Sequence, residues 1–203
     1  MTIGNSRMLT CPFCGEEKEI MSLLSGNNIG VQIWSDNKQF ARMLPEISYI
    51  QKCPCCGKYY IIGRQAIKRA EKSCSRERGL LTFAEMKEAF SQFSEEGFIN
   101  ESEESHVRMM LHHAFNDYYF RNGDNIKIDI DDWILFRKNC IWLIDNFISD
   151  NILKAELYRE ICEFEKAKEL LESVEIYDVF IKRFAILIQE KISKNDCRVF
   201  RIK

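Results

Sequence analysis

Two pentapeptides decide the fold of this chain: Cys11-Pro-Phe-Cys-Gly15 and Cys53-Pro-Cys-Cys-Gly57, which share the form C-P-x-C-G. A C-x-x-C pair in a tight turn places two thiolates on one side of the backbone, and the glycine that follows relieves the steric cost of the turn. Four thiolates suit Zn²⁺ in tetrahedral coordination and leave no open position for a substrate or a reactive water. The spacing therefore predicts one structural zinc ion per chain, with Cys11, Cys14, Cys53 and Cys56 as its ligands.

The same motif leaves two other interpretations open. A rubredoxin site also uses paired C-x-x-C-G turns, so iron with a redox role is the alternative metal. Two free dithiols are the other alternative, although a thioredoxin-like C-x-x-C opens a helix in a βαβ unit and neither pair does so here. Aligning the two pentapeptides makes Cys56 the equivalent of Cys14, so we expect Cys55 to bind no metal. Cys74 has no partner at ligand spacing and is expected to have a surface or packing role.

The chain changes character near residue 80. Six of its nine cysteines and a net charge of +5 fall in residues 1–80, whereas the rest of the 203 residues carry −7. In the first part, short β-rich pieces at 31–34, 48–52 and 59–62 are separated by turn signals. Beyond residue 80, apolar side chains recur at helical spacing. We therefore place a small zinc-ribbon domain with a basic C-terminal segment at 1–80 and a helical domain at 81–203.

Several helices can be predicted in the second part. Thr82-Phe-Ala-Glu85 has the form of a capping box, and an apolar stripe runs from Val107 to Tyr119. Asp131 and Asp132 suit a helix N-terminus, and the stripe that follows makes Cys140 a core residue. Further helices are expected at 151–162, 165–173 and 176–193.

One helical repeat is suggested by spacing alone. The small and aromatic positions between Ala155 and Leu171 match a tetratricopeptide (TPR) unit, with Cys162 where the turn glycine of such a unit usually stands. A shift of 34 residues gives no second match. The predicted fold class is α+β: a small N-terminal β-rich zinc ribbon followed by an all-α, TPR-like helical domain.

Other candidate sites are weaker. Residues 64–78 hold six basic and two acidic side chains, so a nucleic-acid surface is an alternative function. Its candidate contacts are Lys58, Arg64, Lys68, Arg69, Lys72, Arg76 and Arg78. The three histidines, His106, His112 and His113, fall outside the apolar stripe of their helix and are expected to be solvated or to lie in an interface. The segment 84–99 resembles an EF-hand entry helix, but it lacks the alternating oxygen ligands of a calcium loop.

Taken together, the paired C-P-x-C-G motifs, the segment from Gly26 to Glu46 and the stretch from Ala155 to Leu171 resemble a family of bacterial proteins that join a zinc ribbon to TPR-like helices. The resemblance is most specific over 11–62 and 152–173. It implies the fold and a zinc site whose ligands match Cys11, Cys14, Cys53 and Cys56, and it implies no activity.

These observations favour a non-enzymatic protein. The predicted metal site is closed, and the sequence contains no catalytic triad, phosphate loop or dinucleotide fingerprint. We expect a protein-interaction or scaffold module with a protein or peptide partner. No apolar run approaches the ~18 residues of a transmembrane helix, and the first ten residues lack a signal-peptide pattern, so we expect a cytoplasmic protein without a membrane partner.

Overall fold

The structure is a computed structural model that describes residues 2–44, 46–63, 67–69, 80–121, 126–175 and 178–202. The chain forms two compact units. The N-terminal unit comprises Met1–Gln32 and Gln39–Phe98, and the helical unit comprises Ile33–Lys38 and Ile99–Lys203. The sequence pattern predicts a boundary between residues 80 and 81, but these units assign the helix at 83–96 to the first part and a six-residue segment near Asp36 to the second. The mixed α+β class is confirmed.

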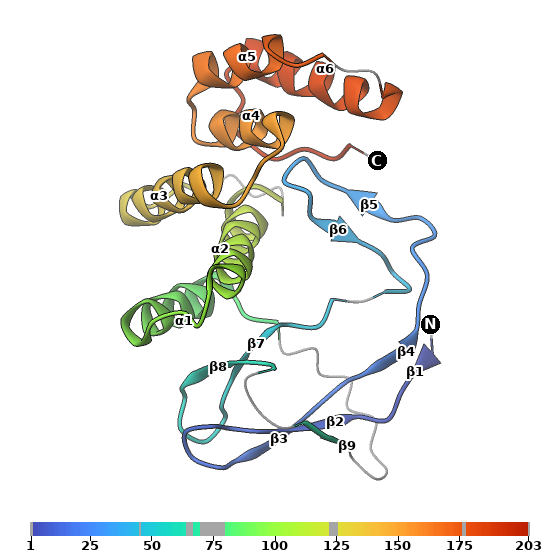
Figure 1. The fold of residues 1–203 in the computed structure, drawn as a ribbon, viewed down its shortest axis with the longest axis vertical. Coiled ribbons are helices and arrows are strands. Elements are labelled where there is room, and N and C mark those ends of the chain that lie inside the picture. The colour runs from blue at the N-terminus through green and yellow to red at the C-terminus, as the bar shows by residue number, and fades with distance from the viewer. Residues whose placement is uncertain are drawn as a thin grey trace. The chain divides into compact units, whose positions relative to one another are not determined.

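Short antiparallel strands build the N-terminal unit (Figure 1). Strand β2 (Arg7–Thr10) lies between β3 (Glu17–Ile20) and β9 (Ile67–Arg69) in a three-stranded sheet. Strands β7 (Ile50–Lys52) and β8 (Tyr59–Ile61), which lie in two of the predicted β-rich pieces, pair as a hairpin, and β1 (Thr2–Ile3) pairs with β4 (Leu23–Ser25). Strand β9 lies inside the basic segment 64–78.

Helix α1 (Phe83–Glu96) closes the N-terminal unit. Its predicted capping box is present: the Thr82 hydroxyl accepts from the Glu85 N–H, and the Glu85 carboxylate accepts from the Thr82 N–H. A separate core cluster lies between the hairpins, where Leu9, Ile20 and Tyr60 surround the two buried cysteines. Because this core is small, it contributes little hydrophobic stabilisation of its own.

The helical unit contains α2 (Glu101–Asn116), a π-helical turn η1 (Asp117–Arg121), α3 (Ile130–Asn146), α4 (Asn151–Glu160), α5 (Phe164–Glu172) and α6 (Val179–Ser193). All of the predicted helices are confirmed, within a few residues at their ends. Four of the five α-helices begin at an Asn or Asp whose side chain accepts from backbone N–H groups of the first turn, namely Asn100, Asp129, Asp150 and Asp178. Local sequence therefore fixes where these helices start.

Helices α4 and α5 form an antiparallel hairpin (Figure 1). The turn between them is a Schellman motif: the Glu163 N–H donates to the Tyr158 C=O at 2.8 Å, and the Cys162 N–H donates to the Arg159 C=O at 3.0 Å. Cys162 adopts the left-handed conformation, with φ of 63°, at the position where the sequence comparison expects a glycine. Ala155, Ala167 and Ile188 join α4, α5 and α6 in one apolar core. The described helices do not establish a TPR-like repeat.

The segment 33–38 belongs to the helical unit although it lies between two strands of the N-terminal part of the chain, β5 (Gln32–Ile33) and β6 (Gln39–Phe40). It pairs with the C-terminal end: the Ser35 N–H donates to the Phe200 C=O at 2.9 Å, and the Ile202 N–H donates to the Ile33 C=O at 2.8 Å. These bonds join the segment 33–38 to the C-terminal end of the helical unit, after α6. Among the residues that the structure describes, no helix combines the length and apolar character needed to cross a membrane.

Candidate metal centre

The two C-P-x-C-G motifs occupy the tips of two hairpins with the same backbone geometry. In the first, the Cys11 N–H donates to the Glu16 C=O at 2.8 Å and the Gly15 N–H donates to the Cys11 C=O at 3.0 Å. Cys53 and Gly57 repeat these two bonds at 2.9 and 3.0 Å. Gly15 and Gly57 have φ of 79° and 73°, a region that side chains with a Cβ rarely adopt. The repeated motif therefore produces a repeated turn.

The four predicted ligands come together in the N-terminal unit. The sulfur atoms of Cys11, Cys14, Cys53 and Cys56 all lie within 4.8 Å of one another. Cys11 Sγ is 3.7 Å from Cys56 Sγ, and Cys14 Sγ is 3.5 Å from Cys53 Sγ. This group can hold a metal ion. Cys55 is exposed and lies outside it, as the alignment of the two pentapeptides predicts.

The surroundings of Cys53 and Cys14 shift the pKa values of these two thiols in opposite directions. Burial raises the pKa of Cys53, but hydrogen bonds from the backbone N–H groups of Cys56 and Cys55 lower it. The net effect is a pKa lowered to about 7. For Cys14 the backbone contact at Glu16 lowers the pKa, whereas burial and the neighbouring sulfurs raise it, to about 12. Burial and the nearby cysteines also raise the pKa of Tyr60 to about 12. Four thiolates at this separation repel one another, so a bound cation is needed to keep them all ionised.

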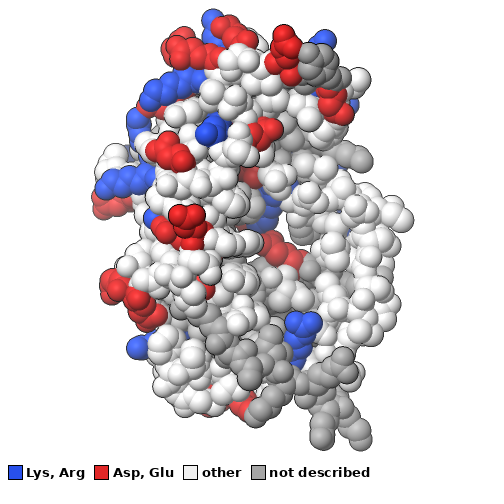
Figure 2. Space-filling view, viewed as in Figure 1, with Lys and Arg blue, Asp and Glu red and all other residues white. Residues whose placement is uncertain are grey.

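The predicted nucleic-acid residues are only partly covered. Lys58 is exposed, and its Nζ lies 4.5 Å from the centroid of the Phe13 ring, so it bridges the two hairpin tips. Lys68 and Arg69 lie in β9 and pair with Met8 and Arg7 of β2. Outside the described residues lie Arg64, Lys72, Arg76, Arg78 and Cys74. On the face drawn in Figure 2, basic and acidic side chains are interspersed, and nucleic-acid binding remains a prediction.

One of the three histidines, His112, departs from expectation. Cys140 is fully buried in α3, as predicted, and His106 is exposed. His112, however, is only 1% exposed, and the expectation that it is solvated or lies in an interface is wrong. The apolar stripe describes one face of α2, but His112 meets Glu160 of α4, 48 residues away, at 2.7 Å. No local sequence signal indicates that contact.

Comparison of the chain with protein-family models, with curated proteins and with solved structures found no match. The geometry of the chain itself therefore carries the functional argument.

Proposed function

We propose that Cys11, Cys14, Cys53 and Cys56 bind one structural Zn²⁺. The single observation that carries this proposal is the spacing of the sulfurs. With Zn–S bonds of ~2.3 Å, the edge of a tetrahedron is about 3.8 Å. The separations of 3.7 Å between Cys11 and Cys56 and 3.5 Å between Cys14 and Cys53 are close to this value. Four thiolates complete the tetrahedral coordination and leave the metal no open position for a substrate, so its role is structural.

A rubredoxin-like iron centre is the alternative, because iron accepts the same four thiolates. Element analysis of the purified protein distinguishes the two metals. We expect about one zinc per chain and no visible colour. A red protein containing iron, with thiolate-to-iron absorption, would overturn the zinc assignment. The variant Cys56→Ser should lose the metal and Cys55→Ser should keep it, because only Cys56 belongs to the four-sulfur group.

For the whole chain we propose a non-enzymatic role as a protein-interaction or scaffold module, in which the zinc unit supports a helical unit that binds a protein or peptide. Exposed apolar side chains on α6 support this role: Val179 is 83% exposed and Ile186 is 52% exposed. Burying such apolar side chains against a partner removes them from water and so contributes favourably to the free energy of binding. We further propose that the α4–α5 hairpin acts as one TPR-like unit.

The interaction role is tested with two surface variants. Purified wild-type protein and the variants Val179→Lys and Ile186→Lys are used as bait under identical conditions, and the bound proteins are identified by mass spectrometry. We expect one partner to be retained by the wild type and lost by both variants. The variant Glu165→Lys on exposed α5 is the control and should keep the partner. If no protein distinguishes the wild type from the α6 variants, the proposed surface is wrong.

A further inference from the structure

A second polar cluster lies inside the helical unit and shares no residue with the predicted metal ligands. The amide nitrogen Nδ2 of Asn116 donates to Asp36 Oδ2 and to Glu160 Oε2, both at 3.0 Å. Glu160 Oε2 also lies 2.7 Å from His112 Nε2, and Arg121 pairs with Asp36. The cluster joins the 33–38 segment, α2, the π-helical turn and α4. Asn116, His112 and Glu160 are at most 1% exposed.

The charges of this cluster do not balance. Asp36 pairs with Arg121, and Glu156 pairs with Arg159. Each of these four side chains is at most 8% exposed. The ion-pair partner of Glu160 is His112, which is charged only when protonated. Among the residues that the structure describes, three buried carboxylates in this cluster thus face two buried guanidinium groups. A buried carboxylate needs a compensating positive charge or a proton. One positive charge, from His112 or from a ligand, completes the set.

Several hydrogen-bonding atoms in the cluster also lack partners within the described structure. These atoms are His112 Nδ1, Asn116 Oδ1, Glu160 Oε1 and Arg121 Nε. When His112 is neutral and donates its Nε2 proton to Glu160, its Nδ1 is an acceptor. Three of the four unpaired atoms are then acceptors. Because buried polar atoms are normally paired, they call for a group that carries several N–H or O–H donors.

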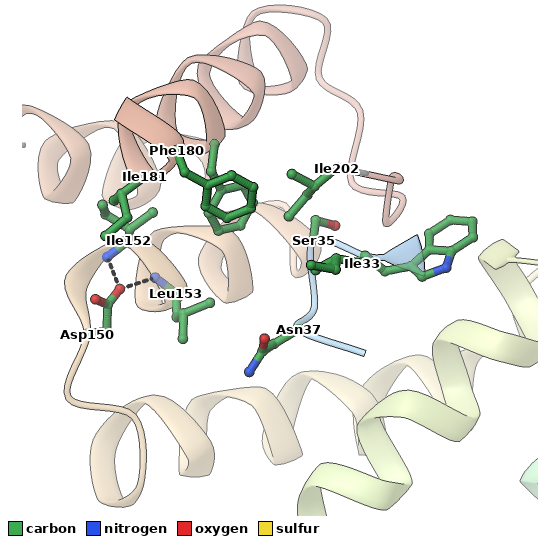
Figure 3. Close-up of a pocket in the computed structure, with 11 residues that line it drawn as sticks. Ile33, Ser35, Asn37, Asp150, Ile152, Leu153, Phe180, Ile181 and Ile202 are labelled. Atoms are coloured by element: carbon green, nitrogen blue, oxygen red, sulfur yellow. Dashed lines mark hydrogen bonds between the residues drawn. The ribbon is translucent and has the colours of Figure 1, made fainter. Parts of the chain in front are cut away.

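Two adjoining cavities give such a group a place to bind. The first, of about 80 Å³, is lined by the polar residues Asp36, His112, Glu156 and Glu160 on one side. The second, of about 180 Å³, is mainly apolar and shares Ser35, Asn37 and Leu153 with the first. Figure 3 shows its walls: Ile33 of the 33–38 segment, Ile152 and Leu153 of α4, Phe180 and Ile181 of α6, and Ile202. An apolar cavity of about 150 Å³ accommodates a benzene ring.

A divalent metal ion fits this cluster less well than a monovalent cation. Ligand atoms of Asp36, His112 and His113 lie within 4.8 Å of one another. However, Asn116 Nδ2 lies 3.0 Å from Asp36 Oδ2 and 3.3 Å from His112 Nε2, and the Arg121 guanidinium already pairs with Asp36. A second positive charge would also exceed the single charge that the carboxylates lack.

We propose that the two cavities together bind a small primary amine, with its ammonium group beside Glu160 and a short apolar group in the cavity beside Phe180. When His112 is neutral, an ammonium group supplies the one positive charge that the carboxylates then lack, and its N–H donors match the unpaired acceptor atoms of His112 and Glu160, two residues that line the smaller cavity. The apolar group displaces water from a wall of aliphatic and aromatic side chains. The site is independent of the metal centre, since every residue in it belongs to the helical unit.

The test uses benzylammonium as the probe, with neutral benzyl alcohol and anionic benzoate as matched ligands of similar shape. Binding to the full-length protein is measured by NMR titration of backbone amides. We expect benzylammonium to shift amides of the 33–38 segment and α4, and to bind at least about tenfold more tightly than benzyl alcohol, because hydrogen bonds to a charged group are the stronger kind. Benzoate should not bind.

Variants separate the charged and apolar parts of the site. Glu160→Gln should reduce benzylammonium affinity about tenfold or more and leave benzyl alcohol affinity unchanged, whereas the exposed control Glu165→Gln should change neither. Leu153 lines both cavities, so the larger side chain of Leu153→Trp should fill the space between them and abolish binding while leaving the charges in place. If Glu160→Gln does not fold, Leu153→Trp is the test. Equal affinity for the amine and the alcohol, or binding of none of the probes, would overturn the proposal and leave ordered water as the occupant.

Discussion

The side chain of Gln92 forms two hydrogen bonds with the backbone of Tyr59. Its Oε1 accepts from the Tyr59 N–H at 2.9 Å, and its Nε2 donates to the Tyr59 C=O at 2.8 Å. The carboxamide thus pairs with β8 as a neighbouring strand would. Tyr59 in turn donates its hydroxyl to Glu88 at 2.6 Å. Because β8 begins at Tyr59, two residues after Gly57 of the second C-P-x-C-G motif, these bonds join α1 to the hairpin that carries this motif.

Replacing Gln92 with Leu should destabilise the N-terminal unit. The change leaves the Tyr59 N–H and C=O without these partners, and losing two such bonds from a buried strand costs about 1–3 kcal/mol. Urea unfolding measures the loss in the free energy of unfolding, and hydrogen exchange of the β7 and β8 amides shows where in the chain protection is lost. The variant Gln189→Leu, at an exposed position of α6 in the other unit, is the control and should leave β7 and β8 unchanged. Equal protection in both variants would contradict the structural role of Gln92.

Removing the metal should unfold the N-terminal unit and spare the helical unit. The small core around Leu9 and Tyr60 cannot compensate for a metal-binding free energy on the order of 10 kcal/mol. After treatment with a strong chelator, hydrogen exchange should accelerate in β2, β3, β7 and β8. All three tryptophans, Trp34, Trp133 and Trp142, belong to the helical unit, so tryptophan fluorescence should stay constant. Full protection of the hairpins in metal-free protein would refute the structural role of the metal.

Cys162→Gly should stabilise the helical unit. Cys162 has φ of 63°, a conformation that glycine adopts without the steric cost of a Cβ. The expected gain is about 0.5–1 kcal/mol in the free energy of unfolding, since the larger steric relief is partly offset by the greater freedom of glycine in the unfolded chain. Chemical denaturation monitored by tryptophan fluorescence measures it. Cys162→Ala keeps the Cβ and should show no gain, so equal stabilisation by both variants would argue against backbone strain.

The helical unit should lose stability as the pH falls from about 6.5 to 4. Burial lowers the pKa of His113 from 6.5 to about 4, even though Asp36 opposes that change. As the pH falls, His113 is therefore protonated in the unfolded chain before it is protonated in the folded protein. The free energy of unfolding is unaffected above pH 6.5 and falls by roughly 3 kcal/mol between pH 6.5 and 4. His112 has the opposite sign: Glu160 raises its pKa against the effect of burial, so its contribution is lost as the pH rises above 6.5.

His113→Asn tests this assignment. Without the imidazole, the free energy of unfolding should fall less between pH 6.5 and 4 than it does in the wild type. Below pH 4 a further loss should remain in both proteins. Burial opposes ionisation of Asp36, but His113, Arg121 and Asn116 favour it, and the pKa is lowered to about 2. His106→Asn changes an exposed histidine and should reproduce the wild-type curve. An identical slope in His113→Asn and the wild type would rule out His113 as the cause.

The features that sequence predicts well are those made by residues close together in the chain. Each cysteine turn is closed by hydrogen bonds within six residues, and the capping box spans Thr82 to Glu85. The starts of α2, α3, α4 and α6 likewise depend on a single Asn or Asp and the N–H groups just after it. Pairing the two motifs into one four-sulfur group also followed from sequence, because each turn alone supplies only half of a tetrahedral site.

The features that sequence missed depend on contacts between distant residues. His112 reads as a surface residue along α2, but Glu160 and Asp36 cover it from segments 48 and 76 positions away. Strand β9 in the basic segment forms because β2 offers it an edge, and α1 groups with the hairpins through Gln92 rather than with the other helices. Sequence by itself determined which four cysteines come together and where the helices lie, since local geometry decides both. Only tertiary structure decided which polar groups are buried together, because burial depends on what the rest of the chain packs against each side chain.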